Sequence, residues 1–248
     1  MTEAIHQRLD SIRLDFRVNI LHACESGSRA WGFASPDSDY DVRFIYIHKR
    51  DHYLSIDEPH DVIELPISDL LDINGWELRK ALRLFRKSNA PLYEWLQSPI
   101  VYQSDPDFIE SLRGLMSTYF SPRAMMHHYL SMVNNVMNND LSGIEVKLKK
   151  YFYALRPILA SRWIAEYNEV PPMEFAKLRV LLDKDLHTII DDLLAKKATV
   201  DEKFAINPIM EIHRWLDSQL AYCESRIPDA SRSSDSEPLN ELFRKFIL

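Results

Sequence analysis

The sequence predicts an α+β fold in two parts: a domain of mixed strands and helices over residues 1–110 and an all-helical domain over residues 111–248. Two observations support this division. Short apolar runs typical of strands occur in the first hundred residues, whereas from about residue 106 the apolar residues recur with the helical period. A chain of 248 residues, 46% of them hydrophobic, can build a core in each part.

The first part contains the predicted strands. Apolar residues at helical spacing indicate an opening helix: Ile5, Leu9, Ile12 and Phe16. Strands are predicted over 18–23 and 42–47, and two further short candidates, 61–65 and 69–73, lie on either side of a proline. A second helix is predicted over 76–87, with a basic outer face that fits either a solvated surface or a contact with RNA or phosphate. The basic face consists of Arg79, Lys80, Arg83, Arg86 and Lys87.

The second part is predicted to be helices separated by polar or proline-containing turns. The Ser-Pro pair at 121–122 is typical of an N-cap followed by proline at the first helical position. The helical pattern over 145–167 contains Pro157, which we expect to kink it or to end its first half. Residues 228–238 are small and polar, which predicts a mobile linker before a last amphipathic helix over 239–248.

Charge and cysteine content limit the class of protein. A formal net charge of −7 argues against a surface that grips long nucleic acid everywhere, because such binding depends on Lys and Arg neutralising phosphates. Cys24 and Cys223 are far apart and lack metal-ligand spacing, which is typical of a reducing compartment. No apolar run approaches the ~20 residues that span a bilayer. We therefore expect a cytoplasmic protein with no membrane partner.

The segment 27–48, GSRAWGFASPDSDYDVRFIYIH, carries the pattern with the clearest chemical meaning. Residues two apart in a strand point to the same face, so Asp39 and Asp41 would project together and repel unless a cation lies between them. Carboxylate oxygens suit Mg²⁺ or Mn²⁺, with phosphate oxygens of a substrate completing the coordination. Gly27 permits close backbone approach, and a helix beginning near Ser28 would offer free N–H groups to a phosphate. The segment therefore predicts a nucleoside triphosphate site.

Two commoner phosphate motifs are excluded. Gly27 and Gly32 have the spacing of a phosphate loop, but Phe33-Ala34 stands where that loop requires Lys followed by Ser or Thr. The sequence contains no G-x-G-x-x-G, so a Rossmann dinucleotide site has no support.

The Gly-Ser pair, the ten residues after it and the Asp-Tyr-Asp that follows resemble the signature of the DNA polymerase β-type nucleotidyltransferase superfamily. The wider sequence is similar to the YcgL-type predicted nucleotidyltransferases, also called the RNA repair pathway-associated group (RlaP). Five segments match in order: GSRAWGF, SDYDVRFIY, LDINGWELRKALRL, KSNAPLYEWLQSPIVY and KKYFYALRPILASRWI. The resemblance covers residues 20 to 165 and implies a small, twisted, mixed β-sheet nucleotidyltransferase domain ahead of the helical domain.

The resemblance also implies roles for single residues. Asp39 and Asp41 match the paired metal-binding carboxylates, and Gly27 with Ser28 matches the turn that holds the triphosphate. The superfamily uses a third carboxylate on a later strand, usually to activate the attacking hydroxyl.

Two residues are candidates for that third carboxylate. Asp72 occupies the matching place before the second helix, and Glu64 is its rival. We favour Asp72 because an Asp followed at this distance by Leu-Arg-Lys recurs in related nucleotidyltransferases.

A second group of candidates lies on the helix predicted over 145–167. At 100° per residue, Lys149, Tyr153 and Arg156 share one face, with Lys150 on its flank. A cation, an aromatic hydroxyl and a second cation at this spacing suit a triphosphate tail along the helix. The arrangement also resembles a Lys…His…Arg pattern of related nucleotidyltransferases, with tyrosine in place of histidine. All four residues are therefore predicted to bind nucleotide.

The predicted activity is transfer of a nucleoside monophosphate from an NTP to an acceptor hydroxyl, with release of pyrophosphate and with Mg²⁺ or Mn²⁺ as cofactor. An RNA end as acceptor fits the family's association with RNA repair, and a protein hydroxyl or a small molecule fits the residues equally. Two other classes stay open. One is a nucleotide- or RNA-binding module that has lost catalysis, and the other is a metal-dependent phosphohydrolase, which leaves the Gly-Ser turn unexplained. The sequence predicts no oligomeric state.

Overall fold

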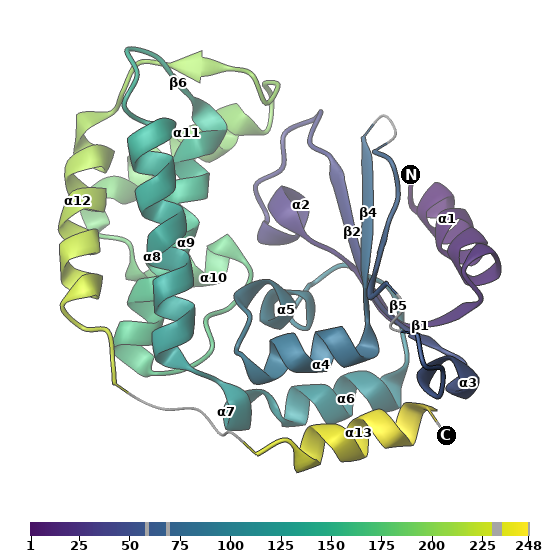
Figure 1. Cartoon of the computed structure of the whole chain (residues 1–248). Helices are drawn as coiled ribbons and strands as arrows, with labels where there is room; N and C mark the ends of the chain where they lie inside the picture. Colours follow the sequence, from purple (N-terminus) through teal and green to yellow (C-terminus); the bar gives the residue numbers. More distant parts are fainter. Residues whose placement is uncertain (58–59, 68–69, 230–234, 248) are drawn as a thin grey trace. The chain divides into compact units, whose positions relative to one another are not determined.

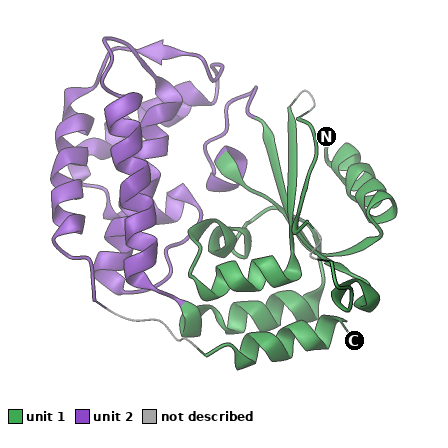
Figure 2. Cartoon of the chain, in the orientation of Figure 1, with its two compact units in different colours: residues 1–27, 39–119, 232–248 green, residues 28–38, 120–231 purple. Residues whose placement is uncertain are grey.

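The computed structural model describes residues 1–57, 60–67, 70–229 and 235–247. The chain forms two compact units, coloured separately in Figure 2. Unit 1 comprises residues 1–27, 39–119 and 232–248, and unit 2 comprises residues 28–38 and 120–231.

These units divide the chain differently from the predicted boundary between residues 110 and 111. Residues 111–119 pack with the sheet-containing unit 1, and residues 28–38 pack with the helices of unit 2. Of the predicted linker 228–238, residues 230–234 lie outside the described residues.

A five-stranded mixed sheet forms the centre of unit 1 in the described part of the chain. Its strands are β1 (Val18–Glu25), β2 (Tyr40–His48), β3 (Val62–Glu64), β4 (Leu71–Glu77) and β5 (Val101–Ser104). The order across the sheet is β3-β4-β2-β1-β5, and β2 pairs with β4 in parallel while the other neighbours are antiparallel. The α+β fold with a mixed sheet is therefore as predicted.

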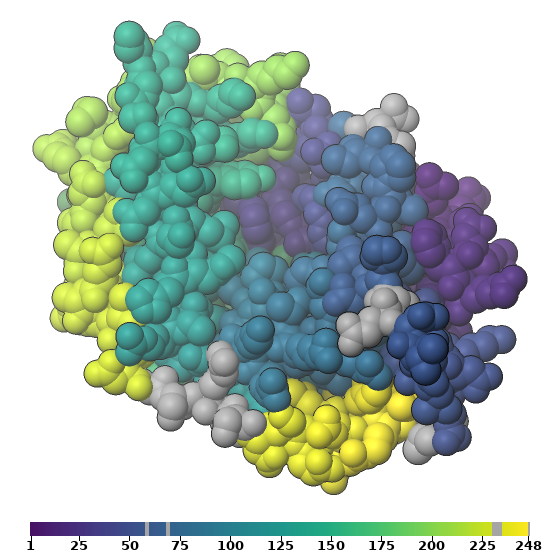
Figure 3. Space-filling view, in the orientation of Figure 1, coloured from purple at the N-terminus to yellow at the C-terminus, as the bar shows by residue number. Residues whose placement is uncertain are grey.

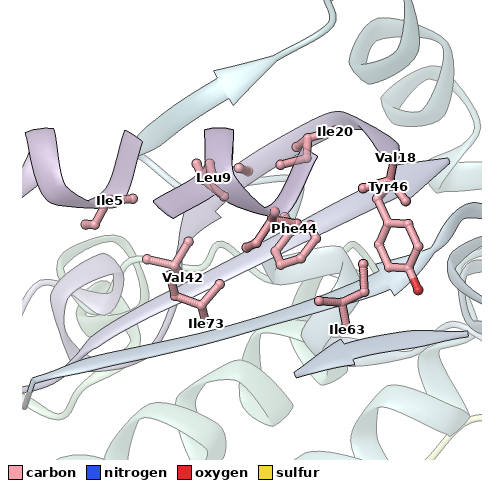
Figure 4. Close-up of a cluster of buried hydrophobic side chains, with 11 residues drawn as sticks. Ile5, Leu9, Val18, Ile20, Val42, Phe44, Tyr46, Ile63 and Ile73 are labelled. Carbon is pink, nitrogen blue, oxygen red and sulfur yellow. The ribbon is translucent and has the colours of Figure 1, made fainter. Parts of the chain in front are cut away.

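One face of this sheet is closed by the opening helix α1 (Thr2–Asp15), which buries Ile5, Leu9 and Ile12 as predicted. Phe16, predicted to continue the stripe, follows the end of the helix and is 42% exposed. Alternate residues of β2 point to this face, so Val42, Phe44 and Tyr46 share a core with α1 (Figure 4). On β4, a Cβ at Gly75 would lie 2.2 Å from the Phe44 ring, so the absence of a side chain there makes room for the phenylalanine. The cluster contains Ile5, Leu9, Ile12, Val18, Ile20, Ala23, Val42, Phe44, Tyr46, Ile63 and Ile73.

On the side away from α1 lie α4 (Leu78–Arg86) and α5 (Ala90–Trp95), and α4 packs on β2 and β4 (Figure 1). The helix predicted from residue 76 begins at Leu78, because Trp76 and Glu77 continue the strand. The Glu77 carboxylate then caps α4 by accepting the N–H groups of Arg79 and Lys80, at 2.7 and 3.3 Å. The remaining helices of unit 1 are α3 (Arg50–Tyr53), α4 (Leu78–Arg86), α5 (Ala90–Trp95), α6 (Pro106–Gly114), α7 (Met116–Tyr119) and α13 (Glu237–Ile247).

Unit 2 is built around the long helix α9 (Leu148–Tyr167), which packs against α8 (Pro122–Asn139) and α12 (Met210–Glu224). The Ser121 hydroxyl accepts the N–H of Ala124 at 3.3 Å, so α8 begins as predicted. The other helical segments are α10 (Phe175–Leu178), α11 (His187–Lys197) and the 3₁₀ turns Arg179–Leu181 and Lys184–Leu186.

Two details of unit 2 differ from the predictions. Pro157 does not end the first half of the helix, one of the two outcomes expected of it: α9 continues through the proline, because the residues around it are buried and packing holds both halves in place. The predicted all-helical domain also contains a short antiparallel pair, β6 (Val146–Lys147) with β7 (Ala205–Ile206). No helix in the described ranges is long and apolar enough to cross a membrane.

Candidate active site

The turn after β1 brings the backbone of Gly27 against a carboxylate. Gly27 has φ +58°, and a Cβ built on it would lie 2.0 Å from Oδ2 of Asp41. The N–H of Ser26 donates to the Asp41 carbonyl at 2.8 Å and fixes this approach. Left-handed φ and lack of space both require glycine here. The short helix α2 (Gly27–Trp31) follows, so a helix begins beside Ser28 as predicted.

Asp41 and Asp72 lie directly opposite each other on the parallel strands β2 and β4. Arg43 lies between the two carboxylates, donating to Oδ1 of Asp41 at 3.1 Å and to Oδ2 of Asp72 at 2.7 Å. The two acidic side chains are about a quarter exposed, at 27% and 26%. The structure thus places Asp72 beside Asp41, whereas Glu64 is an exposed residue of the edge strand β3, paired in register with Asn74.

Asp39 lies immediately before β2 and is exposed. The strand was expected to include it, but the sheet ladder begins at Tyr40, whose N–H donates to the Leu70 carbonyl at 2.6 Å. Among the residues that the structure describes, no three His, Cys, Asp or Glu side chains are grouped as around a metal ion. Metal binding by Asp39 and Asp41 therefore stays a prediction.

A buried glutamate supports Asp41 from the neighbouring strand. Glu25, the last residue of β1, is fully buried, and its Oε1 accepts the backbone N–H of Asp41 at 2.7 Å. Its Oε2 accepts the hydroxyl of Tyr102, and the Ser98 hydroxyl donates to its carbonyl at 2.7 Å. Because a buried carboxyl is costly unless it is hydrogen-bonded, this set of contacts fixes where β2 begins relative to β1.

In unit 2, the residues after Gly27 are held by aromatic contacts with α9. The Trp31 ring lies 5.5 Å from that of Tyr153, and the Phe33 ring stacks on Phe152 at 5.2 Å. The guanidinium of Arg156 lies 4.7 Å from the centre of the Trp31 ring. The segment 28–38 is therefore anchored to the helix that carries the predicted nucleotide-binding residues.

Those four residues of α9 have different environments. Lys149 forms an ion pair with Glu202 at 2.6 Å, and Lys150 forms one with Asp140 at 3.0 Å. Arg156 is 1% exposed, and its Nε donates to the carbonyl of Met173 at 3.0 Å. Its place in the core of unit 2 follows from the burial of α9 on almost every side. A phosphate contact by these residues and by Tyr153 stays a prediction.

A second buried polar network in unit 2 holds the end of segment 28–38. Ser38 donates to Glu202 at 2.8 Å, and the same carboxylate accepts Lys149. Burial opposes ionisation of Glu202, but the hydrogen bonds from Lys149 and Ser38 outweigh it and lower its pKa. Lys197, 1% exposed, donates to the Ser35 hydroxyl at 2.8 Å, and burial lowers its pKa.

The sequence model of a protein family, the RNA repair pathway DNA polymerase beta family (RlaP), matches residues 1–245 of this chain. The chain belongs to this family. It is 46% identical over 239 residues to the uncharacterized protein YcgL of Bacillus subtilis (strain 168), a match covering 96% of this chain and 90% of that protein. A nucleotidyltransferase-like protein from Exiguobacterium sibiricum 255-15 matches with 15% identity and a TM-score of 0.34, over 97% of this chain and 80% of that one.

Membership of the family confirms the resemblance stated from the sequence, and it indicates an enzyme of the polymerase β nucleotidyltransferase type. Sequence reasoning found Gly27, Asp41 and Asp72, which the fold of this RlaP-family chain brings together. It missed Glu25 and Arg43. The signal for Glu25 was an acidic residue at the end of the predominantly apolar run ILHACE, and the signal for Arg43 was its position two residues after Asp41, on the same face of the strand.

Proposed function

We propose that this RlaP-family protein transfers a nucleoside monophosphate from an NTP to an acceptor hydroxyl, which an RNA end would supply, in the cytoplasm. The observation that carries the proposal is the pairing of Asp41 and Asp72 in register, with the backbone of Gly27 against the Asp41 carboxylate. The two carboxylates lie on adjacent strands, beside a turn whose glycine has no side chain. Such an arrangement can hold the phosphate of an NTP and an acceptor hydroxyl next to each other.

The residues of this site fit a divalent cation in their chemistry. The Arg43 guanidinium pairs with both Asp41 and Asp72, so the Asp41 carboxylate already attracts a positive group. Their oxygens are of the type that Mg²⁺ and Mn²⁺ prefer. Asp39 and Asp41 would hold the ion, which when bound would neutralise charge on the phosphates.

The protein's own residues account for the rest of the proposed reaction. Gly27 and Ser28 would position the triphosphate, and Asp72 would accept the proton of the acceptor hydroxyl. The hydroxyl oxygen forms a bond to the α-phosphorus, the bond from that phosphorus to the bridging oxygen breaks, and pyrophosphate leaves with the bonding electrons. The predicted contacts of Lys149, Lys150, Tyr153 and Arg156 with nucleotide belong to the same proposal.

The test uses the purified protein, Mg²⁺, each of the four NTPs labelled on the α-phosphate, and cellular RNA and protein fractions. We expect label to enter one fraction with release of pyrophosphate, and EDTA to abolish this. Asp41→Asn should lower turnover at least ~100-fold, while Arg43 can still pair with Asp72 and keep the fold intact. Asp15→Asn, the same change at an exposed residue of α1, should have no effect.

Three outcomes would contradict the proposal. Release of inorganic phosphate with no transferred label would indicate a phosphohydrolase. Binding of an NTP with no turnover under any condition would indicate a binding module that has lost catalysis. Near-normal transfer by Asp41→Asn would exclude the paired carboxylates as the centre of the reaction.

A further inference from the structure

A groove rich in arginine runs between α4 and α13 in unit 1, away from the paired carboxylates. Figure 3 shows the side chains of α13, in yellow, bordering the blue side chains of unit 1, and the two helices are in contact. The groove encloses about 400 Å³ and is lined by Arg79, Arg83 and Arg86 of α4, with Ser236, Asn240 and Phe243 on the α13 side.

The described residues that line this groove carry positive charge only. No acidic side chain is among those that line it, and none of its three arginines forms an ion pair within the described ranges. An adjoining cavity of about 310 Å³ shares Arg79 and Arg83 but is also lined by Asp57, Asp61 and Glu77. In a chain of net charge −7, a groove lined by three arginines and no acid is unusual and favours an anionic ligand.

Two of the arginines are held in place before any ligand arrives. The Arg79 guanidinium lies 5.2 Å from the centre of the Tyr53 ring and 5.2 Å from that of the Phe243 ring. Arg86 donates to the hydroxyl of Ser236. A guanidinium that is already ordered loses less entropy when it binds a phosphate, so these contacts prepare the groove for one.

The spacing of the arginines selects the type of anion. Residues 79, 83 and 86 share one face of α4 and extend over about 10 Å of its axis, at 1.5 Å per residue. A single phosphate can accept two N–H groups from one guanidinium, so three guanidiniums spread over this length offer donors for more than one phosphate. The groove therefore fits several phosphates in a row.

The position of the groove separates it from the triphosphate of the reacting nucleotide. The strand β4 carries Asp72 near its beginning and leads into α4 at its end (Figure 1). Asp72 and Glu77 are five residue steps apart along β4, which amounts to about 17 Å at 3.3 Å per residue. An NTP whose α-phosphate lies at Asp41 and Asp72 would keep its own phosphates near Gly27.

We propose that the groove between α4 and α13 binds the phosphodiester backbone of a single nucleic-acid strand. This strand would be the acceptor, so its connection to transfer rests on the proposed function, whereas its binding to the groove does not. Guanidinium groups paired with backbone phosphates would position the strand without reading its bases, since phosphate contacts carry no sequence information.

The test measures binding of a fluorescein-labelled 12-nucleotide oligouridylate, and of the matching oligodeoxyuridylate, by anisotropy over a range of salt. Because single strands lose about 0.7 in log affinity per log salt for each neutralised phosphate, three arginine contacts predict a slope of about −2. Arg83→Gln should weaken binding about tenfold and reduce the slope by about 0.7. The triple variant Arg79→Gln, Arg83→Gln, Arg86→Gln should bind only weakly.

The matched control is Arg8→Gln, which removes the same charge from an exposed residue of α1 on the other side of the sheet. It should bind like the unmodified protein. Binding that is equal in the triple variant and in the control would overturn the proposal. So would tripolyphosphate binding as tightly as the oligonucleotides, since the groove would then be a site for a small polyphosphate.

Binding and transfer are measured separately. If the oligonucleotide binds in an arginine-dependent way but no nucleotide is transferred to it, the groove is supported and the proposed function fails. If nucleotide is transferred to the oligonucleotide equally well by the triple variant, the proposed function is supported and the groove is not.

Discussion

Two buried polar networks, one in each unit, hold their segments by different means. In unit 1 the carboxyl group of Glu25 accepts hydrogen bonds from the backbone N–H of Asp41 and from the hydroxyl of Tyr102. In unit 2 the carboxylate of Glu202 meets the ammonium group of Lys149 and the hydroxyl of Ser38. The first network fixes the backbone of a strand, and the second balances charge around the end of a loop.

This difference shows that the segment from Gly27 to Asp41 is divided between the two units. Gly27 and the two aspartates belong to unit 1, whereas the segment 28–38 that joins them is packed within unit 2. The network around Glu25 in unit 1 therefore positions the predicted chemistry, and the network around Glu202 in unit 2 secures the connection.

The largest expected effect comes from replacing one glycine in each unit, Gly27 in unit 1 and Gly32 in unit 2. Gly27→Ala places a Cβ 2.0 Å from Oδ2 of Asp41 at φ +58°, so Asp41 must move and turnover should fall at least ~100-fold. Gly32→Ala meets nothing within 4 Å at φ +90°, so it should cost only backbone strain of about 1–2 kcal/mol. Turnover and urea denaturation of both variants check this, and equal losses of turnover would show that unit 2 governs the site as strongly as unit 1.

The next effect is a dependence of stability on pH, and it sharpens the comparison because it arises from His22 on β1, the strand of unit 1 that also carries Glu25. Burial lowers the pKa of His22 to about 4, against the weaker opposing effect of a hydrogen bond to the Trp95 carbonyl. The unfolded chain takes up a proton near pH 6.5 and the folded chain only near pH 4, so stability is lost as the pH falls through this window. This lowering of the His22 pKa corresponds to about 3 kcal/mol of unfolding free energy, because the residue is only 1% exposed.

The measurement is the urea midpoint of unfolding between pH 8 and pH 4, for the protein and for His22→Gln. The variant should be less stable at pH 8 but should show a flatter decline below pH 6.5. A decline of the same steepness in both proteins would assign the acid sensitivity to other groups.

The smallest effect compares the two glutamates directly. Glu25→Gln keeps an acceptor for the Asp41 N–H but weakens both hydrogen bonds of the side chain. The free energy of unfolding should fall by about 1–2 kcal/mol, and kcat should fall at nearly unchanged KM. Glu202→Gln removes the partner of the partly exposed Lys149 and should cost about 1 kcal/mol with kcat largely retained. Urea denaturation and steady-state kinetics check both, and a larger loss of kcat in Glu202→Gln would reverse the roles assigned to the two networks.

Sequence reasoning predicted local features well, because they depend on neighbouring residues. The burial of Ile5, Leu9 and Ile12 on α1, the strand in 42–47 and the N-cap at Ser121 are confirmed. The turn at Gly27 was predicted because a positive φ and a close approach leave few alternatives to glycine.

Features that depend on pairing across the chain could not be predicted in the same way. The register that sets Asp41 beside Asp72 arises because β4 returns parallel to β2, which no local pattern specifies. Arg156 was predicted to share one face of α9 with Lys149 and is 1% exposed, because a helix that is buried on most sides has no single polar face. Glu25 was missed because a carboxyl that ends an apolar strand has no distinctive periodicity.

The division of unit 1 into three chain segments has a consequence for synthesis on the ribosome. The helix α13, which packs on α4, α6 and β2, is made after the whole of unit 2. Until then, the apolar surface that Leu239 and Leu242 bury and the arginines of α4 are uncovered in the nascent chain. The groove between α4 and α13 is therefore completed late, so a nascent chain that lacks α13 would carry the sheet and its carboxylates without the proposed strand site.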